Sequence, residues 1–494
     1  EEDATEGNGF GKNDFLICAK CGKILHESQR AEFDCDCGAV HYIRIRKAEV
    51  KGTRSEHRCP CCNTGHMKTF YLGYDAATAV LGTELFEQLP ESEAVLKRKN
   101  AEEQSTGGLF SMAVASKPMV ETIKKKRQFL SFSDSSSEAA FFACYMTSFY
   151  QEFLRRRGIW HVIKENQDSI NSNPWEIGTL VNELTAYFDT NRTFAKAGAT
   201  GKENLTADSR RQAWIAVLNE MVGARRSTSL VSMGILDFSY KGNNPEIMEN
   251  VAKQYNKSVE DVTALFHLLV MDLVYNGALE GEGVNLTGDE REYIYYAAFP
   301  RRFVKCKQSD SERKKNSLSG WIPRKRANGG SFKNGRVNRT MQVLGISEEE
   351  AIKLLSDFWD AVLVKSKFNM TAMITNNGTE YYISTNRFVV KAGSEDLPIF
   401  VCEKCGKTTM TNCQGKCISI KCDGKLRRIS HEALLSDNHF ARLYSTEQMH
   451  PMHIKEHTAQ LGRKEQQEYQ EMFVNKEINA LSCSTTFEMG VDVG

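Results

Sequence analysis

Residues 127–157 read RQFLSFSDSSSEAAFFACYMTSFYQEFLRRR and carry the clearest local signal of the fold class. Residues 127–134 form a basic lead-in to a short apolar strand, and a polar turn leads directly into a helix predicted over 138–157. The apolar side chains of this helix recur at helical spacing, and Gly158 is predicted to end it. A strand, a tight polar turn and a helix in succession form the unit from which α/β sheets are built.

Residues 160–395 change character and are predicted to be mainly helical. Ser347 and Glu350 have the spacing of a capping box before a helix over 351–364. Residues 372–384 (AMITNNGTEYYIS) predict a hairpin after that helix. Helices followed by a short hairpin indicate a winged-helix-like module.

The α/β character returns near residue 440. An amphipathic helix predicted over 463–473 precedes a β-like run over 478–484 (INALSCS). Together with residues 127–157, these segments predict two pieces of one α/β domain that flank a large helical insert.

Composition narrows the class of protein. The chain has 494 residues, of which 41% are hydrophobic and 26% charged, as in ordinary globular proteins of two to four domains. The sequence contains no run of about 18 apolar residues, so it predicts no membrane-spanning helix. The acidic, Gly-rich start (EEDATEGNGF) lacks the features of a secretory signal, so a cytoplasmic location is expected.

The strongest motif is a pair of cysteine pairs in residues 396–430. Cys402-x2-Cys405 and Cys417-x4-Cys422 have the spacing of a structural zinc ribbon, in which four thiolates surround the ion. Cys413 is a spare that could replace Cys417. The alternative is a set of free buried thiols.

A second cysteine cluster predicts a zinc module over residues 1–70. Its pairs are Cys18 with Cys21, Cys35 with Cys37, and Cys59 with Cys62. The first four could form one ribbon. Cys59 and Cys62 could then bind a second ion with His57 or His66, or instead complete the first site.

A basic segment covers residues 301–340, with 13 Lys or Arg and two acidic residues. Trp321 with Arg324, Lys325 and Arg326 is a candidate single-strand contact, because such strands bind positive grooves with stacking aromatics. The alternative is a solvated loop.

The final stretch 483–494 (CSTTFEMGVDVG) follows the last predicted strand. In a RecA-like motor, a strand of this kind delivers Thr hydroxyls and backbone amides that can hold a nucleic-acid phosphate. The Gly-x-Asp turn after it lies near the nucleotide of the facing domain.

The chain resembles superfamily 2 DEAD/DEAH-box helicases of the large bacterial type with zinc ribbons, including those of the Druantia and DISARM anti-phage systems and a DNA-repair relative. The resemblance covers the first cysteine cluster and segments 77–90 (ATAVLGTELFEQLP), 129–144 (FLSFSDSSSEAAFFAC), 226–240 (RSTSLVSMGILDFSY), 401–426 and 456–494. It implies that FLSFSDS is motif IV and STTFEMGVDVG is motif V of the second RecA-like domain.

The resemblance also implies roles for single residues. Thr485 and Thr486 would contact the DNA backbone, Gly490 and Asp492 would couple ATP state to DNA grip, and Arg463 would shape the same face. Where the family usually continues FSDS with Arg-Gln, this chain has Ser136-Ser137, which puts that contact in doubt.

Motifs for ATP chemistry are missing from the sequence. There is no GxxxxGK[ST] loop, since GATGKE at 198–203 has the wrong spacing, and no DExH box or motif VI. We therefore expect a fragment that lacks the first motor domain and is inactive alone, with ATP and Mg²⁺ bound only by the full-length protein.

The resulting interpretation is an α/β RecA-like second motor domain interrupted by a winged-helix-like insert, with zinc ribbons. Its segments are a zinc module (1–70), the first part of the RecA-like domain (71–160), the insert (161–395), a zinc ribbon (396–430) and the second part (431–494). Expected partners are single-stranded DNA or a duplex end, and other defence proteins. The alternative is a non-catalytic zinc-ribbon and winged-helix DNA-binding protein.

Overall fold

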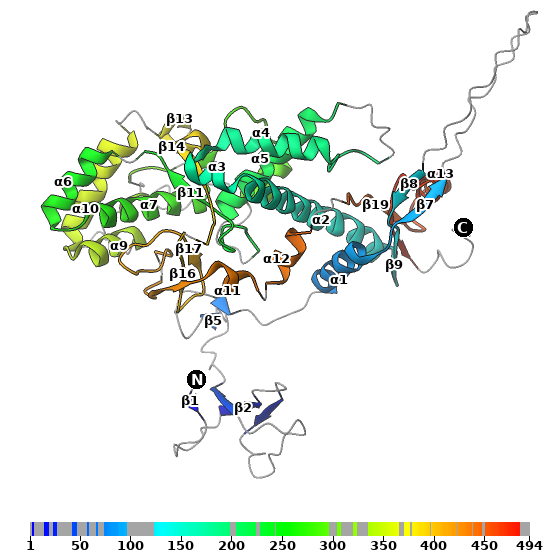
Figure 1. Ribbon diagram of the computed structural model, residues 1–494, viewed down its shortest axis with the longest axis horizontal. Helices are drawn as coiled ribbons and strands as arrows, with labels where there is room; N and C mark the ends of the chain where they lie inside the picture. Colours follow the sequence, from blue (N-terminus) through cyan, green and yellow to red (C-terminus); the bar gives the residue numbers. More distant parts are fainter. Residues whose placement is uncertain are drawn as a thin grey trace, which may run out of the picture. The chain divides into compact units, whose positions relative to one another are not determined.

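The computed structural model describes residues 2–3, 14–18, 23–26, 42–46, 57–58, 66–67, 74–95, 123–197, 204–223, 228–242, 244–295, 304–307, 320–323, 334–364, 370–375, 378–395, 397–420, 422–436, 438–446 and 450–484. The fold is mixed α/β with several small sheets (Figure 1). The chain forms two compact units, Glu1–Phe70 and Tyr71–Gly494.

The described residues of the first unit form short antiparallel strands. One sheet has the order β1-β4-β2-β3 and contains β1 (Glu2–Asp3), β2 (Asp14–Cys18), β3 (Ile24–His26) and β4 (Tyr42–Arg46). A separate hairpin pairs β5 (His57–Arg58) with β6 (His66–Met67). Strands this short bury little apolar surface, which is why modules of this kind usually depend on metals or disulfides.

Three parallel strands join the two predicted halves of the α/β unit. The sheet order is β19-β20-β9, with β9 (Phe129–Ser133), β19 (Ile454–His457) and β20 (Ala480–Ser484). Phe129 lies opposite Ala480, and Ser133 lies opposite Ser484. Segments from the two ends of the second unit are therefore neighbouring strands, as the sequence predicts.

The helix after β9 is longer than the sequence predicts. α2 covers Ser136–Glu165, and the hydroxyl of Ser135 caps its start by accepting from the Glu138 N–H. Gly158 lies inside α2, so the prediction that it ends the helix is wrong. A Cβ at position 158 would lie 2.3 Å from Cε1 of Phe188, so glycine is required here by close helix packing.

A continuous hydrophobic core runs through the second unit from Phe86 to Ala480. α2 contacts the parallel sheet and also packs against α4 (Ile177–Thr190) and α5 (Thr206–Gly223) (Figure 1). A second, smaller cluster beside the parallel sheet contains Phe473, Ile478, Leu481 and Cys483.

The other helices described in this unit form or border that core. They are α1 (Tyr74–Gln88), α3 (Gln167–Ser172), α6 (Pro245–Tyr255), α7 (Val259–Tyr275), α8 (Gly288–Tyr295), α9 (Gly335–Leu344), α10 (Glu348–Phe358), α11 (His431–Leu435), α12 (His439–Tyr444) and α13 (Arg463–Val474), with a π-helix η3 (Trp359–Val364) and a 3₁₀ turn η4 (Thr385–Arg387). The capping box of Ser347 and Glu350 is present at the start of α10, as predicted.

Small sheets complete the second unit, and their orders are β10-β15-β11, β12-β14-β13, β17-β16-β18 and β7-β8. Their strands are β7 (Ser92–Val95), β8 (Ile123–Lys126), β10 (Trp175–Glu176), β11 (Leu236–Tyr240), β12 (Leu279–Glu280), β13 (Thr371–Thr375), β14 (Gly378–Ser384), β15 (Phe388–Ala392), β16 (Ile399–Cys402), β17 (Thr408–Thr409) and β18 (Leu426–Ile429). The hairpin predicted over 372–384 is confirmed as β13 and β14.

Candidate functional site

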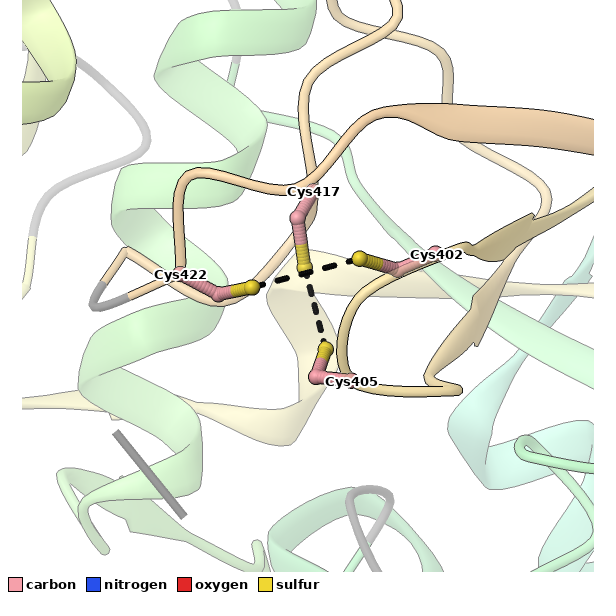
Figure 2. Close-up of side chains that lie close together, drawn as sticks. All are labelled: Cys402, Cys405, Cys417 and Cys422. Carbon is pink, nitrogen blue, oxygen red and sulfur yellow. Dashed lines mark hydrogen bonds between the residues drawn. The ribbon is translucent and has the colours of Figure 1, made fainter. Parts of the chain in front are cut away.

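Four cysteines from two turns converge at one end of the β17-β16-β18 sheet. Cys402 ends β16 and Cys405 lies in the turn that follows it, whereas Cys417 and Cys422 come from the loop before β18. Figure 2 shows the four sulfur atoms turned toward a common centre. The four cysteines that the sequence spacing selects are therefore the ones that the fold brings together.

The distances fit a single metal ion. The four Sγ atoms lie within 4.8 Å of one another, with Cys402 to Cys422 at 3.9 Å and Cys405 to Cys417 at 3.5 Å. Sulfurs bonded tetrahedrally to zinc at about 2.3 Å are separated by about 3.8 Å. Because protein sulfurs fill all four positions, the geometry is consistent with a structural zinc ion.

Backbone N–H groups point toward these sulfurs and favour their thiolate forms. Ser419 N–H donates to Cys417 Sγ at 3.3 Å, and Gly424 N–H donates to Cys422 Sγ at 3.4 Å. Hydrogen bonds from Cys417 and from the Lys407 N–H lower the pKa of Cys405 to about 5. The hydrogen bond to Cys405 raises the pKa of Cys417, and burial raises the pKa of Cys422 to about 11, so Cys405 is the first of these three thiols to lose its proton.

Glycine is required beside the cluster. A Cβ at Gly424 would lie 2.5 Å from the Sγ of Cys402, closer than real atoms approach. Gly406, directly after Cys405, has a φ of +70°, which only glycine adopts readily. Both glycines allow the backbone to turn tightly around the sulfurs.

Two buried arginines on α9 connect the cluster to the helical core. Arg339 Nη2 donates to the carbonyls of Ser419 and Cys422, at 2.9 and 2.7 Å. One turn earlier, Arg336 forms a buried ion pair of 3.0 Å with Asp272 of α7. Hydrogen bonds from α9 thus fix the loop that carries Cys417 and Cys422, and an ion pair fixes α9 to α7.

Cys413 is separate from the cluster. It is fully buried in the main core, and its Sγ lies 4.0 Å from the carbonyl of Asp261. Burial raises the pKa of its thiol to about 12. Cys417, and not Cys413, therefore occupies the fourth ligand position, which resolves the alternative that the sequence left open.

The described residues of the N-terminal sheet share two backbone features with this ribbon. The sequence CAKCGK (18–23) matches CEKCGK (402–407), and in both the first cysteine N–H donates to the sixth residue's carbonyl at 2.9 Å. Cys18 lies opposite Tyr42 of β4, as Cys402 lies opposite Leu426 of β18. Cys18 is buried, while Cys21, Cys35, Cys37, Cys59 and Cys62 lie outside the described residues.

A second candidate region is the carboxyl edge of the parallel sheet. Because β9, β19 and β20 are parallel, Ser133, His457 and Ser484 end their strands at the same edge. α2 begins soon after β9 ends, and α13 begins soon after β19 ends. Two helix N-termini, each with a partial positive charge, therefore lie at this edge.

Several polar residues follow the strands at the same edge. Thr458, directly after β19, is 1% exposed, and its Oγ1 has no hydrogen-bond partner among the described residues. Arg463 is exposed and forms the first residue of α13. Thr485, Thr486, Gly490 and Asp492 follow β20 in sequence but lie outside the described residues.

The predicted DNA contact at Trp321 is wrong. Its side chain is fully buried, its Nε1 donates to the Leu355 carbonyl at 2.7 Å, and the Arg336 guanidinium lies over its ring. A base cannot stack on a ring that the core already covers. Arg324, Lys325 and Arg326 lie outside the described residues.

Comparisons with protein families, with curated proteins and with solved structures found no match to this chain. Within the described ranges, no helix has the length and apolar character needed to cross a lipid bilayer.

Proposed function

We propose that this chain is part of an ATP-driven DNA helicase or translocase that acts in antiviral defence. In this proposal residues 71–494 contain the DNA-side half of the motor, and the helical insert and zinc ribbon form an accessory body attached to it. ATP and Mg²⁺ would bind between this half and a second motor domain.

One observation carries the proposal. β9 and β20 come from opposite ends of the second unit, yet they are neighbouring parallel strands whose last residues, Ser133 and Ser484, are paired. Ligands of open α/β sheets bind at the carboxyl ends of the strands. The segments that resemble motif IV and motif V would therefore act on one ligand together.

The chemistry of this edge supports a phosphate backbone as the ligand. The N-termini of α2 and α13 offer partial positive charge, and Arg463 adds a full charge at the start of α13. The carboxylates in the same first turns, Glu138 and Glu465, accept from the Ser133 hydroxyl and the Gly462 N–H.

The alternative proposal is a non-catalytic zinc-ribbon DNA-binding protein. The four-cysteine cluster fits both proposals. Only a motor couples DNA binding at the sheet edge to ATP hydrolysis. The experiment that separates them measures DNA-stimulated ATPase activity in the protein that contains both motor domains.

Thr485→Ala combined with Thr486→Ala should reduce DNA stimulation of the ATPase at least tenfold and leave the DNA-free rate unchanged. The matched control is Thr379→Ala, an exposed threonine on β14 far from this edge in sequence. Unchanged stimulation in the double variant, or no ATPase activity in the parent protein, would contradict the motor proposal.

A further inference from the structure

The outer strand of the β12-β14-β13 sheet is uncovered. β13 pairs on one side with β14, and none of the described residues pairs with its other side. Side chains 371–374 are exposed on both faces, with Ile374 at 89% and Met373 at 42%. Natural proteins usually block such edges with charges, proline or bulges, and β13 has no charge and no proline.

The hairpin register shows which backbone groups of β13 point outward. Thr375 lies opposite Gly378 across a two-residue loop, so this pair exchanges hydrogen bonds and the pattern then alternates along the ladder. Met373 therefore bonds to β14, whereas Ala372 and Ile374 direct their N–H and C=O groups outward. These groups are spaced to receive one more antiparallel strand.

We infer that the strand received is β13 of a second copy of this chain. The sequence TAMIT (371–375) complements itself when two copies run antiparallel about Met373. The outward groups of Ala372 in one copy then face those of Ile374 in the other. Each copy satisfies the free groups of its partner.

The side chains also fit in this register. The small Ala372 lies opposite the large Ile374, a pairing of complementary size. Met373 meets Met373 of the second copy on the twofold axis. No like charges face each other, so self-pairing carries no electrostatic penalty.

The product is a symmetric dimer in which two three-stranded sheets become one sheet of six strands. A contact of five residues per chain is smaller than the roughly 1,200–2,000 Å² of a stable interface, so the dimer dissociates on dilution. This inference is independent of the proposed helicase function.

Charged substitutions of Met373, which lies on the twofold axis of the dimer, test the inference. In sedimentation velocity over a range of concentrations, the native chain should shift from its 55.7 kDa mass toward twice that mass. Met373→Lys and Met373→Glu should each stay monomeric, because like charges meet on the axis. An equal mixture of the two variants should dimerise again, since lysine then faces glutamate.

The control is Val474→Glu, which places a charge at a 52% exposed apolar side chain on α13 and should leave dimerisation unchanged. A native chain that stays monomeric would overturn the inference and leave a foreign extended peptide or nucleic acid as the occupant of β13. Dimers that persist in both single variants, or a mixture that stays monomeric, would overturn it too, because the dimer would then use another surface.

Discussion

Two cysteines of one ribbon differ in their surroundings, and this difference is testable. Cys405 lies among three other sulfurs, whereas Cys413 lies in the apolar core. Cys405→Ser should reduce bound zinc by one ion per chain, because the hydroxyl is a poor ligand for this site. Cys413→Ala should retain the full zinc content, as measured by metal analysis of the purified chain. Equal loss in both variants would contradict the ligand assignment.

Asp237 predicts a pH dependence of stability. Its carboxyl group is buried on β11, and this burial raises its pKa to about 6, against the opposing effects of the Phe238 N–H and Lys391. The unfolded carboxyl ionises near 3.9, so the folded state holds its proton more tightly. The contribution of Asp237 to the free energy of unfolding therefore falls as pH rises from about 4 to about 6.

Asp237→Asn removes this titration. The free energy of unfolding of the variant, relative to the native chain, should rise by about 1–1.5 kcal/mol between about pH 5 and about pH 8. Urea unfolding at both pH values measures the difference. A difference that does not change with pH would show that the native carboxyl is not held neutral.

The sequence predicted the cysteine cluster better than it predicted the surroundings of Trp321 and of the arginines on α9. The four ribbon ligands follow from spacing because zinc fixes the distance between its ligands. Trp321 could not be placed by sequence, since a basic neighbourhood in the chain does not reveal whether a ring is covered. The roles of Arg336 and Arg339 were missed for a related reason, because arginines in a basic run look exposed until α7 and the ribbon loop surround them.

At the scale of elements, Gly158 gives a matched pair of variants. Gly158→Ala should destabilise the chain by about 1–3 kcal/mol, because the new Cβ would collide with Phe188 and outweigh the helix preference of alanine. Gly178→Ala in α4 has no atom within 4 Å of the new Cβ and should be neutral or stabilising. Chemical unfolding of both variants measures this. Similar effects in both would contradict the packing explanation.

Local signals predicted most element positions. The cap residues of α10, the β13–β14 hairpin and the helix α13 all have short-range causes. The length of α2 was not predictable because the partner of Gly158, Phe188 on α4, is specified by tertiary packing. The matching backbone hydrogen bond of the two CxKCGK segments, from the first residue to the sixth, has a sequence signal that direct comparison of the two cysteine clusters would have found.

At the scale of the molecule, zinc removal should loosen one region and leave another intact. Arg339 on α9 binds two carbonyls of the ligand loop, whereas α4 and α5 pack in the core through apolar side chains. After chelation, amide hydrogen exchange should rise in residues 402–429 and in α9 but stay low in α4 and α5. A uniform rise across the chain, or no rise in α9, would contradict this arrangement.

The uninterrupted course of α2 has a mechanical consequence. A helix of 30 residues is about 45 Å long, and this one starts at the carboxyl edge of the parallel sheet and ends among the helices of the insert. Its buried side chains run from Ala139 to Ile163, so packing along its whole length links the sheet to the helices at its far end. A tilt of about 5° at the sheet would move its far end by about 4 Å. A movement at the carboxyl edge of the sheet would therefore displace the helices packed at the far end of α2.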